Sequence, residues 1–588
     1  MTRHFSDMAD TPAPARCSLG TLSFNGPADV VIENPESELT SLLVGISDPF
    51  VDKPDTLQQR IDDLPLQLAC SMLNRRLSRM AREADSCFQQ AGVSQEDMYE
   101  SVSSFGLTVT ANHDKWKEAF ESALLELRRA CVYGFSAAEF NEVLSATLAA
   151  YKRQIGSWPT TDAASMAERI IDSISDKAVI TDPQETLRTL ELGVARIMQN
   201  PDICRQALEK AFDAARARIV MSGSKVQGTA AEDLRDVFDY VMKQEVSATQ
   251  AEEVTPFAYD DLGTPGTIEK QEFIEDLGIT TLTLSNGIRL NLKPVDFQKG
   301  SISVSASVDG GSMRLLHTPG LSNMAHAVMQ QGGLEAHDLT ELEQIMAGKQ
   351  VGLHFGAGVD RMRFSGSTTA EDFELQCKLL VANILYPGFR EDGESQLRRS
   401  LPSMFKRFET TPGGALSFQV PGHIYGIDPR FFPATLEQIS SCTAAQVKDA
   451  LTPWLQHGAM EVSIVGDFKV EEVIPALLRT FGAMPKRNRE FTQLTEAETD
   501  VSKANWGMRK FLPYTTDLDK TIVTQIRPCG DGMDHHRNRR MQVLASITRE
   551  KLFDGIRAQL GETYSPSVRF APNADFRNAA TITTSSAG

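Results

Sequence analysis

Apolar residues along this chain recur either at alternate positions or every three to four positions, which predicts an α+β protein. The clearest passage has two strand-like runs, Gly287–Val295 and Ser301–Val308, followed by a Gly310-Gly311 turn. A helix is expected next, entered through Pro319-Gly320 and ended by Gly332-Gly333. Its apolar face carries residues at helical spacing, namely Leu321, Met324 and Val328.

The same patterns predict antiparallel or mixed sheets with helices packed on them in the rest of the chain. Further strands are expected at Ser41–Ile46, Ala217–Met221, Val351–Phe355, Arg361–Gly366, Glu461–Gly466 and Thr521–Ile526. Helices are expected at Leu64–Arg82, Trp116–Ala130, Ala163–Ile174, within Pro183–Ala215, and at Leu339–Gly348, Ala370–Tyr386, Glu394–Phe408 and Val470–Phe481. Ser136 and Glu139 form a capping box that opens one more helix, because they satisfy free amides at its start.

Composition shifts divide the chain into three units. We expect domains at residues 1–245, 276–490 and 511–588. The segments between them, 246–275 and 491–510, are predicted to be linkers; the first is acidic and contains Pro and Gly.

Several passages recur, which indicates that one α+β unit is used repeatedly. Leu73–Arg82 recurs as Ile547–Arg557, with Arg82 on Arg557. The other recurring passages are Trp116–Ala150 with Phe373–Phe408, and Ile219–Gly223 with Ser463–Gly466.

The order strand, strand, Gly-Gly, Pro-Gly-Leu, helix, Gly-Gly at 287–333 resembles the insulinase/pitrilysin zinc peptidases. In that family the inverted zinc motif His-x-x-Glu-His lies on this helix, directly after Gly-Leu-x. Here the three motif positions hold Asn323, His326 and Ala327. A catalytic zinc needs three protein ligands and a water, and these positions offer at most one ligand. We therefore expect His326 to be an ordinary helix residue and this chain to hold no metal or other cofactor.

The resemblance implies four homologous domains in two halves, which close like a clamshell over a peptide. By this resemblance, the segment 1–245 is similar to the second domain of the family. The segment 276–490 is similar to the third domain, and 511–588 to the opening of the fourth. The chain is then expected to be an internal piece with a half-clamshell architecture. The catalytic domain, with its zinc, would be supplied in cis or in trans.

The resemblance also implies a substrate-binding role for Arg557 and Tyr564. In the family, an arginine and a tyrosine at this spacing in the fourth domain reach the substrate near the zinc. Arginine offers a rigid fork of donors to a peptide carbonyl or carboxylate, and a phenol donates to a developing oxyanion. The alternative is a surface arginine and a core tyrosine, since the earlier repeat keeps Arg82 but has Gln89 where the tyrosine would fall.

Two other features favour ordinary roles. His535 and His536 are neighbours on a predicted helix, so they point in different directions and cannot chelate one metal. Glu394 falls where the catalytic domain of the family keeps its distal zinc ligand, and without the histidines we expect a solvated carboxylate.

The composition of the chain limits the classes of partner that it is expected to bind. Hydrophobic residues at 41% and charged residues at 23% describe a globular protein, and the net charge of -19 argues against nucleic acid. The polar, Pro-rich start, to about residue 35, predicts a lead-in without the apolar core of a signal peptide. No apolar run is long enough to span a membrane, so no membrane partner is expected and the compartment is left open.

These observations lead to two hypotheses. The first is the non-catalytic, substrate-chamber-forming portion of an insulinase-like zinc metalloendopeptidase, which binds peptides or unfolded polypeptides and is inactive alone. The second is a zinc-less binding or assembly protein, similar to the corresponding subunits of processing peptidases and respiratory-complex cores.

Overall fold

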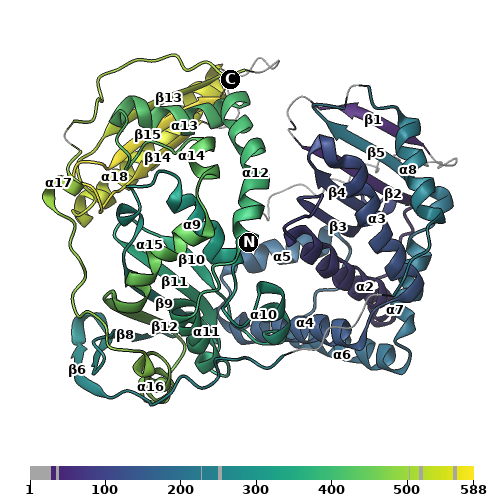
Figure 1. The fold of residues 1–588 in the computed structure, drawn as a ribbon. Coiled ribbons are helices and arrows are strands. Elements are labelled where there is room, and N and C mark those ends of the chain that lie inside the picture. The colour runs from purple at the N-terminus through teal and green to yellow at the C-terminus, as the bar shows by residue number, and fades with distance from the viewer. Residues whose placement is uncertain are drawn as a thin grey trace, which may run out of the picture.

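Three β-sheets organise the protein, shown in Figure 1 as a computed structural model that describes residues 28–34, 37, 39–226, 228–248, 255–501, 503–515, 521–560 and 566–587. The first sheet has the order β1-β5-β2-β4-β3. Its strands are β1 (Asp29–Glu33), β2 (Thr40–Pro49), β3 (Gln90–Met98), β4 (Val102–Ala111) and β5 (Arg218–Gly223). The helices of this first body (residues 28–248) are α2 (Leu57–Arg82), α3 (Trp116–Tyr133), α4 (Ala137–Ser157), α5 (Ala163–Ser175), α6 (Pro183–Gln199), α7 (Asp202–Ala211) and α8 (Ala231–Lys243).

The second sheet has the order β10-β11-β9-β12-β8-β7-β6 and forms the second body (residues 255–501). Its strands are β6 (Ile268–Ile274), β7 (Ile279–Leu284), β8 (Arg289–Pro294), β9 (Ile302–Asp309), β10 (His354–Ala357), β11 (Arg361–Thr368) and β12 (Met460–Gly466). Its helices are α9 (Leu321–Gln331), α10 (Leu339–Ile345), α11 (Phe373–Leu385), α12 (Glu391–Thr410), α13 (Pro412–Tyr425), α14 (Leu436–Ser440), α15 (Ala444–His457), α16 (Val470–Arg479) and α17 (Glu496–Thr499). The third sheet, β13-β15-β14, consists of β13 (Ile522–Pro528), β14 (Ser567–Ala571) and β15 (Thr581–Ala587), with α18 (His535–Leu552) against it.

The first two sheets share one five-stranded topology. In the first, β1 runs parallel to β5, and β5, β2, β4 and β3 pair antiparallel in that order. In the second, β8 runs parallel to β12, and β12, β9, β11 and β10 pair antiparallel in that order. The third sheet repeats the β2-β4-β3 part, with α18 in the place of α2. The predicted α+β fold of repeated units is confirmed, and α2, α9 and α18 are equivalent helices.

Each of the two larger bodies has its own core. Strand residues alternate between buried and less buried positions, as in β2, where Leu42, Val44 and Ile46 are buried. Helices cover these apolar faces, and the two main clusters of buried residues are separate, one in each body. Among the described residues, no helix combines the length and the apolar character that crossing a bilayer requires.

Three segments that we expected to lack regular structure contribute to the fold. β1 falls inside the predicted lead-in and pairs along its whole length with β5. β6 falls inside the predicted linker 246–275, where it forms the edge of the second sheet. Its residues are mostly exposed, so the polar composition that suggested a linker is that of a solvated edge strand. Within 491–510, Phe491 and Val501 are buried, and α17 forms.

The chain before β6 is also held in place. Phe257 and Tyr259 pack against His337, and the backbone N–H of Ala258 donates to His337 Nε2 at 2.9 Å. The Tyr259 ring stacks on Tyr386, with ring centres 4.9 Å apart. Aromatic residues thus fix this part of the predicted linker on the second body.

Helices α9 and α12 cross at a glycine. A Cβ added at Gly393 would lie 2.5 Å from Ala327 O and 2.8 Å from Val328 Cα. Both contacts are with backbone or Cα atoms of α9, which cannot turn aside as a flexible side chain would. The absence of a side chain at Gly393 therefore sets the close approach of these two helices.

Gly393→Ala is expected to destabilise the second body by about 1–3 kcal/mol, because the methyl group would force the two helices apart. Urea unfolding followed by circular dichroism measures this. Gly413→Ala in α13 is the matched control, because a Cβ there meets nothing within 4 Å and alanine favours a helix. Equal unfolding midpoints for the two variants would contradict the proposed contact.

Candidate functional site

The helix that carries the altered zinc motif, α9, is built as the sequence predicts. Gly320 precedes it with φ of +90°, and a Cβ at this position would meet Ile439 Cα at 2.8 Å, so glycine is required. The predicted apolar residues Leu321, Met324 and Val328 are buried. Asn323 and His326 are exposed.

The His326 ring lies beside Phe355 of β10, with ring centres 6.4 Å apart. Ala327 has no donor group and gives its backbone to the contact with Gly393. The three motif positions thus offer one imidazole and one amide on an exposed helix face.

Glu394 corrects one of our expectations, because it is buried rather than solvated. Its Oε2 accepts a hydrogen bond from the N–H of Ala444 at 2.7 Å, at the first residue of α15. Its Oε1 pairs with Arg398 at 2.7 Å. The free amides and partial positive charge at a helix start stabilise a carboxylate there. The residue at the place of the distal zinc ligand therefore caps a helix.

The residues at the motif do not fit a zinc ion. One histidine and one asparagine do not supply three ligands, and the nearby carboxylate is engaged with α15. Within the described part of the chain, no three His, Cys, Asp or Glu side chains come together as they would around a metal ion.

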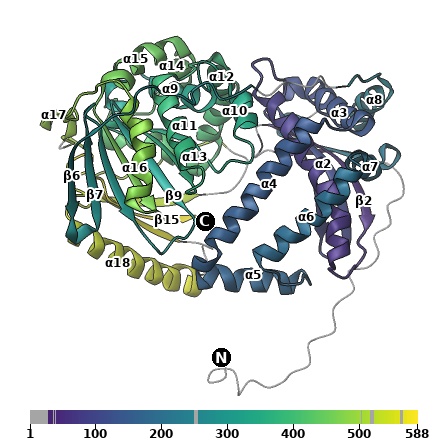
Figure 2. The same ribbon diagram turned by 90° about the horizontal axis from the view of Figure 1, so that it is seen from below.

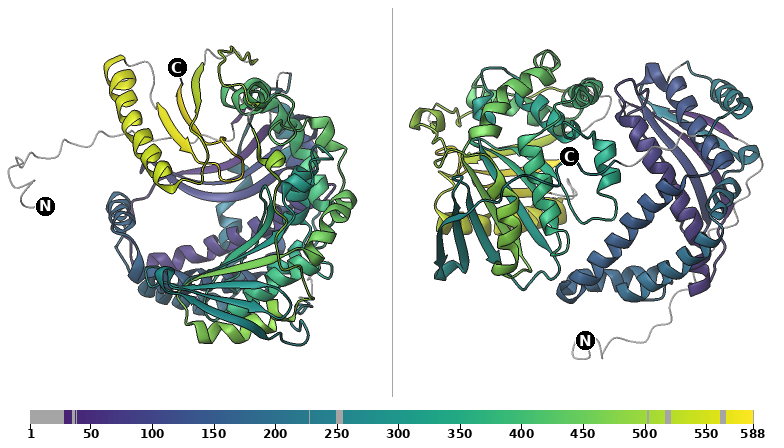
Figure 3. Two further views of the ribbon diagram at one scale, coloured as in Figure 1. Left: turned by 90° about the vertical axis from the view of Figure 1, so that its left-hand side faces the viewer. Right: turned by 60° about the horizontal axis from the view of Figure 1, so that its bottom comes forward.

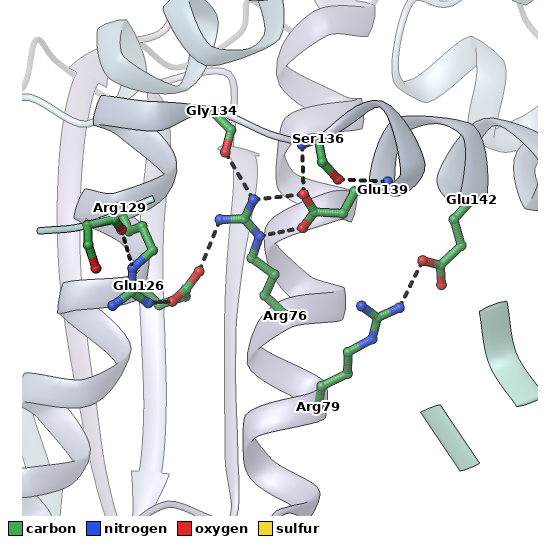
Figure 4. A network of polar contacts seen from close by, with 9 residues as sticks. Arg76, Arg79, Glu126, Arg129, Gly134, Ser136, Glu139 and Glu142 are labelled. Carbon is green, nitrogen blue, oxygen red and sulfur yellow. Dashed lines mark hydrogen bonds and ion pairs between the residues drawn. The ribbon is translucent and has the colours of Figure 1, made fainter. Parts of the chain in front are cut away.

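The equivalent helix of the first body, α2, carries a buried charge network instead (Figure 4). Arg76 donates to Glu139 at 2.5 and 2.8 Å, to Glu126 at 3.1 Å and to the carbonyl of Gly134 at 3.0 Å. The Arg76 guanidinium also lies 4.9 Å from the centre of the Phe135 ring. One arginine thus ties α2 to α3, to α4 and to the loop between α3 and α4.

The other carboxylates of this network are also paired with arginines. Glu126 pairs with Arg129, and Glu142 pairs with both Arg75 and Arg79. The predicted capping box is present, because Ser136 and Glu139 exchange hydrogen bonds at the start of α4. Since each acid here is held by a guanidinium, the network is suited to structure and not to proton transfer.

Opposing effects act on the Glu139 carboxyl. Burial raises the pKa of Glu139. The hydrogen bonds and charge of Arg76, together with the contacts of Ser136, lower it by more than burial raises it, so the pKa lies below its ordinary value. Burial lowers the pKa of Arg76, and Glu139 and Glu126 more than restore it. Both groups are charged at neutral pH.

Two adjoining cavities open beside this network, between the first and second bodies. The larger has a volume of about 650 Å³ and is lined by network residues together with Gln344 of α10 and Ala347, which follows α10. The smaller, of about 570 Å³, lies between Arg82, Arg153 and Lys349. Their walls come from both bodies, so any change in how the bodies are placed changes their shape.

Polar contacts join the two bodies around these cavities. Arg82 pairs with Glu343 at 2.9 Å, and Gln350 Nε2 donates to the carbonyl of Ala149 at 2.8 Å. Arg399 of α12 donates to three carbonyls at the C-terminal end of α2, those of Ala81, Glu83 and Ala84. Backbone carbonyls at a helix end attract a cation, so Arg399 fixes the end of α2 to α12.

Of the predicted substrate-binding pair, Arg557 and Tyr564, the structure describes only Arg557. Arg557 follows α18 in a segment of π-helix, Phe553–Leu560, with its guanidinium 4.7 Å from the centre of the Phe553 ring. Tyr564 lies outside the described residues, so a joint site of Arg557 and Tyr564 stays a prediction. Arg82, at the matching place in the earlier repeat, is used between the bodies instead.

Sequence reasoning missed the role of Arg76. A signal was present, because Arg76 falls at helical spacing within the apolar face of α2, four residues after Met72 and next to Leu77. A charged residue in a buried stripe requires partners, but its partners are about 50 or more positions away in the sequence.

Comparisons with known proteins agree with this fold. Residues 441–586 match the family model described as the peptidase M16 inactive domain. The chain is similar to the chloroplastic stromal processing peptidase of Arabidopsis thaliana, with 21% identity over an alignment of 610 residues. The alignment covers 88% of this chain and 47% of the relative. The predicted resemblance, to a metallopeptidase portion that lacks the catalytic motif, is confirmed.

One solved structure shows the same fold, and a second is reported with it. A mutant of the ferredoxin protease FusC, in complex with Arabidopsis ferredoxin, has a TM-score of 0.57 and 13% identity, and the match covers 100% of this chain and 64% of that one. The periplasmic protease PqqL from Escherichia coli has a TM-score of 0.45 and 16% identity, with the same coverage. The chain thus spans 47% of the curated relative and 64% of each of these structures.

Glu139→Gln is expected to lower the free energy of unfolding at pH 7 by about 2–3 kcal/mol, because Arg76 loses its bidentate partner but keeps Glu126. The folded pKa of Glu139 lies below its ordinary value of 4.5, so its stabilising effect is present above pH 4.5 and is lost as the pH falls through the folded pKa. The difference between wild type and variant should therefore shrink below pH 4.5.

Urea titrations at a series of pH values measure this difference. Glu118→Gln in α3 is the control, since Glu118 is exposed and its ion pair with Lys115 is 4.0 Å long. A difference that is independent of pH, or one that the control reproduces, would show that the Arg76 pair does not stabilise α4.

Proposed function

We propose that this chain is the non-catalytic, substrate-chamber-forming portion of an insulinase-like zinc metalloendopeptidase. The observation that carries the proposal is the use made of the zinc-ligand positions. By resemblance α9 corresponds to the zinc helix of the family, while its motif positions hold Asn323, His326 and Ala327 and the nearby Glu394 caps α15. The match of residues 441–586 to an inactive M16 domain supports the same assignment.

The arrangement of the two bodies supports a chamber-forming role. The two bodies lie side by side in the right-hand view of Figure 3, and the contacts described above join them through α2, α4, α10 and α12. Both cavities lie at this junction. Walls that come from two bodies suit a space that changes shape around a polypeptide.

The substrate class follows from the relatives by analogy. One relative is named a processing peptidase, and the FusC structure contains a protein, ferredoxin. We therefore propose an unfolded polypeptide as the ligand of this chain and a catalytic domain, in cis or in trans, as its partner. Binding of a labelled, permanently unfolded protein such as reduced carboxymethylated lactalbumin tests the first part.

The purified chain is expected to bind no stoichiometric zinc and to cleave no peptide, because its candidate helix supplies too few ligands. Metal analysis combined with a chelator-sensitive peptidase assay measures both properties. About one zinc per chain, with activity that chelation removes, would overturn the proposal. A tight, zinc-free complex with a folded partner, and no affinity for unfolded protein, would favour an assembly protein instead.

Tyr564→Phe is expected to lower kcat on the order of a hundredfold once a catalytic domain is restored, because it deletes a donor to the developing oxyanion. The melting temperature should stay nearly unchanged, since the ring is kept. Tyr240→Phe, at an exposed position of α8, is the control. Wild-type turnover, or loss of folding, would leave Tyr564 with a structural role only.

A further inference from the structure

Helix α5 presents an apolar face that the rest of the described chain does not cover. None of its residues is buried, although Met166, Ile170, Ile171 and Ile174 recur at helical spacing. Ile171 is 62% exposed and Ile174 68% exposed. A helix with this pattern normally buries its apolar side, so the exposed side of α5 is available to a partner.

The helix is nonetheless held in a fixed orientation. Its Asp162 cap accepts from the N–H groups of Ala164 and Ser165, both at 3.0 Å. The Arg169 guanidinium lies 4.9 Å from the centre of the Trp158 ring and donates to the carbonyl of Thr181. Since successive helix residues are about 100° apart, this contact turns Ile171 and Ile174 away from the side that Arg169 occupies.

The loop after α5 extends the apolar surface. Val179 and Ile180 are exposed. The backbone of Val179 is fixed on both sides, since its N–H donates to Asp55 at 2.7 Å and its carbonyl accepts from Arg60 at 2.9 Å. We call the surface formed by Ile170, Ile171, Ile174, Val179 and Ile180 the α5 patch. Because its backbone is already fixed, a ligand would bind it with little ordering cost.

The charge around the α5 patch is negative. Glu168 and Asp172 of α5 and Asp176, directly after it, are exposed and lie four positions apart. Two cations of this segment already have contacts, because Arg169 lies over Trp158 and Lys177 pairs with Asp52 and Glu100 at 2.8 and 3.2 Å. The chain as a whole carries -19. A complementary ligand is therefore apolar on one side and basic on the other.

The α5 patch lies beside the junction of the two bodies. In Figure 2, α5 connects the ends of α4 and α6 where these two helices lie far apart. The turn before α5 touches the second body, because the Lys299 N–H donates to Thr160 Oγ1 at 3.2 Å and Gly300 packs against Gly156. The start of α5 therefore lies close to the second body, which places the patch near the junction.

We propose that the α5 patch docks a basic, amphipathic segment of the polypeptide substrate. The inference rests on the proposed function, since it names where the substrate binds and which substrate segments are preferred. Apolar side chains of the segment would cover Ile171 and Ile174, and its cations would face Glu168 and Asp172.

Fluorescence anisotropy with the full chain tests the proposal. The probes are a labelled 20-residue helix-forming peptide of Leu and Lys, its Leu and Glu counterpart, and reduced carboxymethylated lactalbumin. Ile171→Asp and Ile174→Asp should each raise the Kd of the Leu/Lys peptide at least tenfold, with an unchanged melting temperature because both side chains are exposed. Met198→Asp, at a 57% exposed position of α6, is the matched control and should bind as wild type.

The outcomes separate this inference from the proposed function. If the wild-type chain binds neither peptide nor lactalbumin, the proposed function fails. If it binds all three and the Ile171→Asp/Ile174→Asp double variant binds them equally well, the function stands and the docking site is wrong. Equal affinity for the Leu/Glu peptide would overturn the preference for basic segments. A dimer in light scattering that the double variant dissolves would make a second copy the occupant and overturn the proposal.

Discussion

The buried guanidinium of Arg76 is the interaction on which the first body depends. A charge taken out of water costs several kcal/mol unless its hydrogen bonds are satisfied. Here α3, α4 and the loop between them each supply an acceptor, so these elements must be placed together around α2. The second body packs its equivalent pair of helices without a charge at the crossing. There, the backbone of α9 lies directly against Gly393 of α12.

Local patterns predicted the elements well where one face is buried and the other is not. The spacing of Leu321, Met324 and Val328 placed α9, and the Ser136 and Glu139 pair placed the start of α4. The same reasoning failed for β6, because an edge strand exposed on both sides has no alternation to detect. It also missed the fixed segment around His337, whose contacts with Phe257 and Tyr259 join parts of the chain nearly 80 positions apart.

For the candidate site, the sequence was enough to place the motif positions on one helix, α9. That these positions hold no metal stays a prediction from their residue types; the structure adds that Asn323 and His326 are exposed. The burial of Glu394 was not predictable, because its partner at Ala444 belongs to a helix that begins 50 positions later. The pairing of Arg76 with Glu139 depends in the same way on tertiary placement.

The two bodies stabilise the equivalent crossing of two helices in different ways. A crossing of two helices must satisfy packing and charge balance, and those conditions have more than one solution. An arginine and a glutamate meet them in the first body, and a single glycine meets them in the second. Two bodies with the same strand order can therefore differ completely in the residues at this crossing, so strand order identifies the repeat where residue identity does not.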